Sequence, residues 1–115
     1  MSRDAGSRLQ DILVACETIA RYIERADADD EIVFDAIRIR LVEIGEAVKD
    51  LDPALLTSEP TIPWPEITRM RDTLAHRYFD TAHSIVNATA RNDVPDLASA
   101  ARRLLARLEA QPADE

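Results

Sequence analysis

The chain has 115 residues, a length that suits one domain with a small hydrophobic core, and we predict a single domain over residues 1–115. Its formal net charge of −8 argues against a protein that holds nucleic acid on a broad basic face, because phosphate contacts supply most non-specific affinity. The sequence contains only 2 glycines and is rich in Ala, Leu, Arg, Glu and Ile, which favour helices, so we predict an all-α fold.

The N-terminal stretch MSRDAGSRLQ is polar, whereas a signal peptide needs an apolar segment. Nowhere do roughly 18 apolar residues run together, as a membrane-spanning helix requires. We therefore expect a cytoplasmic protein with no membrane partner.

Metal and cofactor signatures are also missing from the sequence. His76 and His83 are too far apart for a standard helical ligand pair, and no His, Cys or carboxylate cluster has zinc spacing. There is no Gly-rich phosphate loop. We predict neither a metal nor a cofactor. Cys16 lies within an apolar stripe, and we expect it to be buried rather than reactive.

The first helix is predicted over residues 3–26, because its apolar residues recur with the spacing of a one-faced helix. These residues are Leu9, Ile12, Leu13, Cys16, Ile19, Ala20 and Ile23. Asp29 or Asp30 is a candidate N-cap for a second helix, since a carboxylate there accepts backbone N–H groups and suits the helix dipole.

The second helix is predicted to continue to Leu51 and to be apolar over more than one face. Its main stripe contains Ile32, Val33, Ala36, Ile37, Leu41, Ile44, Val48 and Leu51. Ile39 and Val42 lie off this stripe. The extra width predicts contact with a further helix or with a second subunit, and we favour the subunit.

The remaining elements are separated by proline-rich or polar segments. Residues 52–66 contain several prolines and are predicted to form a connecting loop, with Pro65 in the first turn of a third helix. That helix buries Ile67, Met70 and Leu74, and Trp64 is expected to pack the loop onto it. A break capped by Asp80 or Thr81 is predicted next. The next helix contains Ile85, Val86 and Ala90, and Pro95 is expected to separate it from a last helix. The apolar residues of that last helix are Leu97, Leu104, Leu105 and Leu108, and a frayed tail is predicted at 111–115.

The stretch RDTLAHRY at residues 71–78 brings four functional side chains together: Arg71, Asp72, His76 and Tyr78. On an ideal helix Arg71 and Tyr78 lie about 20° apart, whereas His76 lies about 140° from Arg71. Asp72 and His76, at positions i and i+4, can pair and fix the imidazole. For all of them to act on one ligand, the helix must end near His76 or a second copy must share the site. The alternative is the ordinary solvated side of a helix.

The pattern Arg71-x-x-x-x-His76-x-Tyr78 resembles the signature of HEPN domains. The segments RLVEIGEAVKDL, IPWPEITRMRDTLAHRYFD and NDVPDLASAARRLL, in that order, are similar to the HepT-type toxins along nearly the whole chain. The resemblance implies a HEPN-like helical bundle of four to five helices and a homodimer whose two motifs face each other. It also implies metal-independent cleavage of RNA in a type VII toxin–antitoxin system. The cognate partner would be an MNT-type nucleotidyltransferase antitoxin that adds AMP to Tyr78.

The residues support that chemistry if two copies of the motif meet. Attack of a 2′-hydroxyl on phosphate needs a base and an acid, which two copies of His76 supply, and Arg71 is suited to clamp the phosphate while Asp72 orients the imidazole. The alternative function is a non-catalytic dimeric HEPN module that is a partner or substrate of a nucleotidyltransferase. Gly45 and Glu46 are candidates to line the groove of the site. Gly45 could equally mark a point where two helices pack closely. We leave both residues out of the predicted site.

Overall fold

The computed structural model describes residues 4–25, 30–76 and 83–110, without the side chains of His76, His83 and Ser84. The elements within these residues are helical, with no strand among them, and the all-α prediction is confirmed. They are α1 (Ala5–Arg25), α2 (Glu31–Lys49), α3 (Pro53–Leu56), α4 (Trp64–His76), α5 (His83–Ala88), the π-helix η2 (Thr89–Asp93) and α6 (Val94–Ala110).

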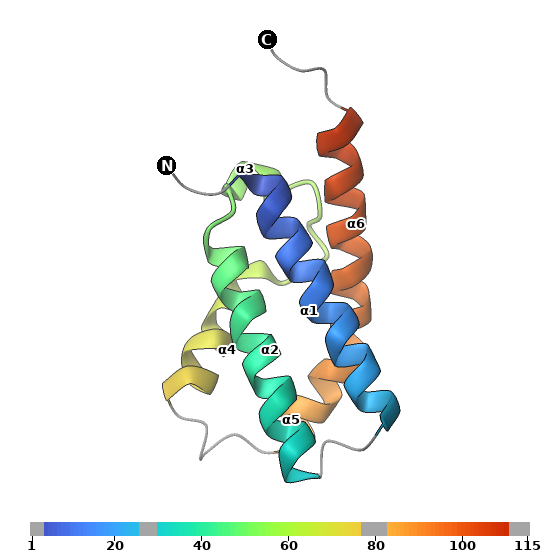
Figure 1. The fold of residues 1–115 in the computed structure, drawn as a ribbon. Coiled ribbons are helices and arrows are strands. Elements are labelled where there is room, and N and C mark those ends of the chain that lie inside the picture. The colour runs from blue at the N-terminus through green and yellow to red at the C-terminus, as the bar shows by residue number, and fades with distance from the viewer. Residues whose placement is uncertain (1–3, 26–29, 77–82, 111–115) are drawn as a thin grey trace.

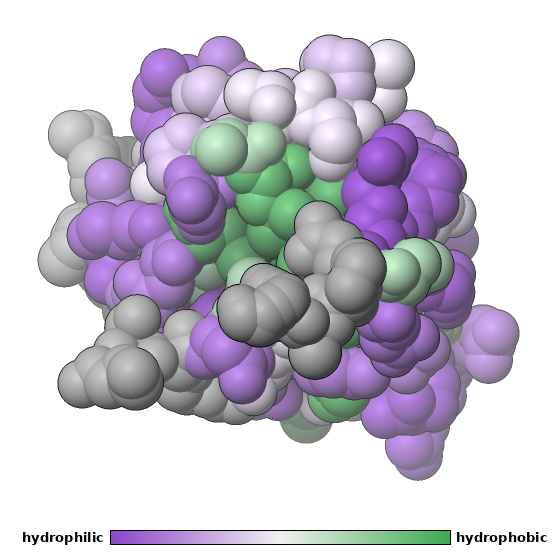
Figure 2. Space-filling view, turned by 90° about the horizontal axis from the view of Figure 1, so that it is seen from above, coloured by the Kyte–Doolittle hydropathy of each residue, from purple (hydrophilic) through white to green (hydrophobic). Residues whose placement is uncertain are grey.

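The long helices form a bundle in which α1 lies between α2 and α6, and α4 packs on the other side of α2 (Figure 1). The short helix α3 lies at one end of this bundle. Seen from that end, the molecule has hydrophobic residues in a hollow surrounded by hydrophilic ones (Figure 2). The largest fully buried side chains are Leu9, Ile12, Cys16, Ile19, Ile37, Ile44, Leu74, Val86 and Leu104.

The helix α1 confirms the predicted first helix, and Cys16 is buried as expected. Burial raises the pKa of the Cys16 thiol to about 12, so the thiol is neutral at physiological pH. None of the described helices has both the length and the apolar composition needed to cross a lipid bilayer.

Asp30 is the N-cap of α2, because its Oδ1 accepts hydrogen bonds from the backbone N–H groups of Ile32 (2.9 Å) and Val33 (3.3 Å). Ile32, placed by the sequence on the main apolar stripe, does not face the core: it is 80% exposed, and Phe34 is buried instead. Phe34 lies one turn before Ile37 on the face towards the core, whereas Ile32 lies about 200° away from Phe34. Ile32 and Ile39 are seven residues apart and therefore share the outer face of α2.

The predicted loop over residues 52–66 is wrong in one part, because it contains α3. Asp52 caps this helix by accepting the N–H of Ala54 (3.0 Å), and Pro53 stands in its first turn, where a missing N–H costs nothing. The predicted role of Trp64 is confirmed. Its indole N–H donates to the carbonyl oxygens of Leu56 and Glu59, both at 3.1 Å, and thus fastens the loop to α4.

Pro95 does not separate two helices, and that prediction is wrong. The chain is helical without a break from His83 to Ala110, because η2 widens the turn just before the proline. The N–H of Val94 donates to the carbonyl of Thr89, five residues earlier. Proline has no amide proton, and its ring clashes with the preceding turn of a regular α-helix. The wider π-type turn before Pro95 accommodates this ring. The predicted cap at Asp80 or Thr81 and the tail at 111–115 lie outside the described residues.

Candidate active site

Arg71 lies opposite Gly45, at a close approach of α4 to α2. A Cβ atom at position 45 would lie 2.2 Å from Cβ of Arg71 and 3.3 Å from the carbonyl oxygen of Ile67. Those distances leave no room for a side chain, so Gly45 is a close-packing point between the two helices. The first carbons of the Arg71 side chain are thereby held against α2.

The Arg71 guanidinium is held by two carboxylates from different helices. Its Nη1 donates to Oδ1 of Asp72 at 2.7 Å, and its Nη2 donates to Oε2 of Glu46 on α2. The hydrogen bonds to Asp72 and then to Glu46 raise the pKa of Arg71, so the group is always charged. With a side chain only 22% exposed, Arg71 is oriented as well as charged.

Glu46 is the residue that sequence reasoning missed. The stretch IGEA drew attention to it, but nothing in the local pattern links it to Arg71, 25 residues away. The only available signal was the glycine beside it, since a glycine inside a helix often marks a close approach of another backbone. Given that approach, the next residue of α2 is within reach of a long side chain from α4.

His76 belongs to α4, the helix that also contains Arg71 and Asp72. The His76 side chain and the whole of Tyr78 lie outside the described residues. The pairing of Asp72 with His76 and the placement of Tyr78 beside Arg71 therefore stay predictions. His83 is the first residue of α5, and its side chain also lies outside the described part of the chain.

The positive charges around the motif are partly compensated. Arg69 forms an exposed ion pair with Glu66, one turn earlier on α4, and Arg71 has the two carboxylates named above. The two carboxylates accept from two of the five guanidinium N–H groups, so a phosphate can bind the remaining ones but meets two negative charges beside them. Among the described residues, no group of three or more His, Cys, Asp or Glu side chains is placed to hold a metal ion.

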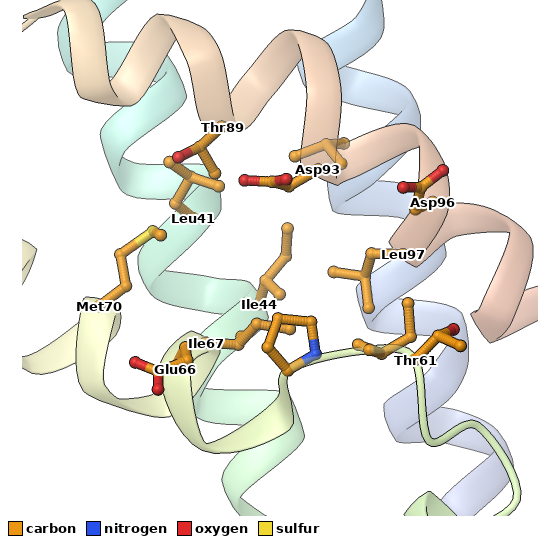
Figure 3. Close-up of a pocket in the computed structure, with 13 residues that line it drawn as sticks. Leu41, Ile44, Thr61, Glu66, Ile67, Met70, Thr89, Asp93, Asp96 and Leu97 are labelled. Carbon is orange, nitrogen blue, oxygen red and sulfur yellow. The ribbon is translucent and has the colours of Figure 1, made fainter.

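A cavity of about 370 Å³ lies on another side of α4, between α2, α4 and the segment from η2 into α6 (Figure 3). Its apolar wall includes Leu41, Ile44 and Leu97, and the carboxylates of Glu66, Asp93 and Asp96 lie around it. Three carboxylates disfavour a phosphate. The cavity is thus a poor site for RNA, and the seam between α2 and α4 at Arg71 is the better candidate.

Comparison with known proteins identifies the family of the chain. The family model described as "Ribonuclease HepT-like" matches residues 11–104, a range that contains Glu46, Arg71 and His76. A "Putative RNase" of Methanocaldococcus jannaschii is 33% identical over 111 residues, covering 93% of this chain and 96% of the relative.

Two further relatives come from other organisms. A "Probable ribonuclease HepT" of Thermococcus cleftensis is 35% identical over 102 residues, covering 84% of this chain and 92% of the relative. A "Putative RNase" of Caldanaerobacter subterraneus subsp. tengcongensis is 32% identical over 101 residues, covering 84% and 90%. No solved structure matches the chain. The chain belongs to the HepT-like ribonuclease family.

Proposed function

We propose that this chain is the toxin of a type VII HEPN/MNT toxin–antitoxin system and that it cuts RNA as a metal-independent endonuclease. The observation that carries the proposal is the fixed, charged Arg71 on the helix that also contains His76, within the range matched to the ribonuclease family. An arginine held by two neighbours can offer its planar fork to a phosphate with little loss of side-chain freedom.

The reaction follows from the two residue types. One His76 imidazole accepts the proton of a ribose 2′-hydroxyl while the 2′-oxygen forms a bond to phosphorus. The bond from phosphorus to the 5′-oxygen breaks, and a second imidazole donates a proton to that oxygen. The products are a 2′,3′-cyclic phosphate and a free 5′-hydroxyl. Arg71 stabilises the charge that develops on the phosphate oxygens, and Asp72 orients the imidazole.

Because one chain has a single motif histidine, the proposed site needs two copies of the chain. The outer face of α2 supports a homodimer: Ile39 is 41% exposed and Ile32 is more exposed still. Apolar residues left in water on one face are a common feature of subunit contacts.

Purified protein incubated with RNA in the presence of EDTA tests this function. We expect cleavage to continue, with cyclic phosphate ends. His76→Ala should lower the rate by about 10² to 10⁴, the usual contribution of an acid–base group. His83→Ala is the matched control, and it should cut at nearly the rate of the unchanged protein. If His83→Ala were the more damaging of two equally folded variants, the site would lie elsewhere.

Control of the toxin is the second part of the proposal. A cognate MNT-type nucleotidyltransferase should add one or more AMP units to Tyr78, placing a phosphodiester where the RNA phosphate binds. Mass spectrometry after incubation with this enzyme and ATP should show the added mass on the peptide containing Tyr78, with loss of cleavage. Tyr78→Phe should abolish the mass shift. AMP found on another residue, or modified protein that still cuts RNA at the full rate, would refute the control mechanism alone.

The alternative is a non-catalytic HEPN module that serves as partner or substrate of a nucleotidyltransferase. The net charge of −8 and the two carboxylates on Arg71 favour it, because both oppose binding of RNA. A dimer that accepts AMP on Tyr78 but cuts no RNA at any salt concentration would support this alternative over the nuclease.

A further inference from the structure

The turn of α4 that contains Leu74 and His76 is fastened to α2 by Arg38. The Nη1 of Arg38 donates a hydrogen bond to the carbonyl oxygen of Leu74 at 3.1 Å, and the interaction is partly buried. Leu74 is itself fully buried, and it lies two residues before His76. A side chain 36 positions earlier in the chain thus reaches the turn of α4 that contains His76.

The guanidinium of Arg38 is a charged donor, and a hydrogen bond from a charged group is stronger than one between neutral groups. The bonded carbonyl belongs to a residue that is only 1% exposed, where water has little access. The bond therefore fastens to α2 the same turn of α4 that contains His76.

Arg38 acts from the same face of α2 that orients Arg71. Arg38 and Gly45 are seven residues apart, which places them about 20° apart on the helix and about 10.5 Å apart along its axis. Gly45 meets Arg71, and Arg38 meets Leu74, three residues further along α4. One face of α2 therefore contacts α4 at Arg71 and again in the turn that contains His76.

We propose that Arg38 is a positioning residue of the nuclease site: by holding the Leu74 carbonyl, it fixes the turn of α4 that contains His76 and so the direction in which His76 presents its imidazole. This inference rests on the proposed function of His76. Arg38 does not contact the substrate in this scheme. Its effect on the rate comes through geometry, since a small misplacement of a reacting group costs up to about 10² in rate.

The test uses the full-length protein with three variants. Arg38→Met removes the guanidinium but keeps an apolar stem, and Arg38→Lys keeps the charge and a donor. Arg40→Met is the matched control, because Arg40 is on the same helix but pairs with Glu43 at 3.1 Å. Each variant is first checked for helix content by circular dichroism and for cooperative unfolding in urea.

Two readouts then separate positioning from binding. The first readout is the rate of cleavage of one defined RNA at varied RNA concentration. Arg38→Met should lose about 10- to 100-fold in kcat, with KM within about threefold of the unchanged protein. Arg38→Lys should recover part of the loss, and Arg40→Met should match the unchanged protein. In histidine-labelled protein, the ring signals of His76 should move in Arg38→Met, while those of His83 should stay, with the two assigned by His83→Gln.

Each contrary outcome has a definite meaning. A folded Arg38→Met with unchanged kcat and unchanged His76 signals overturns the proposal, and so does a rise in KM alone, which would indicate a phosphate contact. Failure of Arg38→Met to fold would show a general structural role and would equally overturn it. If the unchanged protein cuts no RNA, the proposed function fails, yet the His76 signals still decide whether Arg38 positions that residue.

Discussion

At the scale of single residues, the candidate site depends on a missing side chain as much as on those present. Gly45 allows Cβ of Arg71 to lie against the backbone of α2, and only from there does the guanidinium meet both Glu46 and Asp72. A Cβ atom cannot rotate away from its own backbone. Any larger residue at 45 must therefore move the whole of α4 relative to α2.

Gly45→Ala should consequently harm both stability and activity. The added carbon would lie 2.2 Å from Cβ of Arg71, and overpacking of this kind costs roughly 1–3 kcal/mol in the free energy of unfolding. Displacement of Arg71 should also lower the rate of RNA cleavage. Urea unfolding and a cleavage assay on the same preparation measure the two effects.

Gly6→Ala is the control for that experiment. A Cβ atom at position 6 would lie 3.5 Å from Oδ1 of Asp4, an ordinary contact, and the residue stands in the first turn of α1. Alanine there should be neutral or stabilising by up to about 1 kcal/mol. If both substitutions proved equally mild, α2 and α4 would tolerate separation, and the seam would not fix Arg71.

At the scale of elements, the connection between α2 and α4 is an ordered segment and not a slack loop. Besides α3 and the Trp64 indole, it is held by Glu59, whose side chain is only 8% exposed. Arg103 of α6 donates to both carboxylate oxygens of Glu59, through Nε at 2.9 Å and Nη2 at 2.7 Å. This fork joins the loop that leads into α4 to the last helix.

The ion pair predicts a stability that depends on pH. The hydrogen bonds from Arg103 lower the pKa of Glu59 below its ordinary value of 4.5. A carboxyl whose pKa is lower in the folded than in the unfolded chain stabilises the folded state. This contribution is fully present at pH values above the unfolded-state pKa, and it is lost as the pH falls through the folded-state pKa. Glu59→Gln should therefore lower the unfolding free energy at pH 7, and the difference from the unchanged protein should shrink below pH 4.5.

Urea titrations at several pH values measure this difference. Glu17→Gln is the control, because Glu17 makes a single exposed contact to Arg102 at 3.5 Å, and surface pairs of that kind contribute little. Equal effects of the two substitutions at pH 7, or a Glu59→Gln difference that persists undiminished at low pH, would show that the fork does not stabilise the loop.

At the scale of the whole molecule, one chain supplies only one of the two motif histidines that the proposed reaction needs. The motif helix contains one histidine, and the outer face of α2 exposes Ile32 and Ile39. Both observations are accounted for if two copies of the chain associate, although the net charge of −8 per chain opposes that association at low salt.

We therefore expect a homodimer at micromolar concentration, measurable by light scattering after gel filtration in physiological salt. Ile39→Asp should favour the monomer by placing a charge in the contact, and RNA cleavage should fall in parallel with dimer content. A wild-type monomer at these concentrations would remove the composite site. A stable Ile39→Asp dimer would place the contact on another face.

The helices themselves could be predicted because they depend on local pattern. The apolar spacing from Leu9 to Ile19 marked the buried face of α1, and Asp30 could be recognised as a cap from its own chemistry. The same local reasoning failed where the surroundings decide. Ile32 is as apolar as Ile37 but faces outward, and Pro95, elsewhere a helix breaker, is accommodated by the π-turn before it.

The sequence by itself determined the fold class, the family and the identity of the motif residues, because these depend on residue types and spacings along one chain. Only the tertiary structure decided that Gly45 is a packing point, that Glu46 shares Arg71 with Asp72, and that Arg38 holds the turn of α4 that contains His76. The physical reason is that these contacts join residues 25 to 36 positions apart. Which face of α2 meets α4 depends on the packing of the entire bundle, and no local periodicity specifies it.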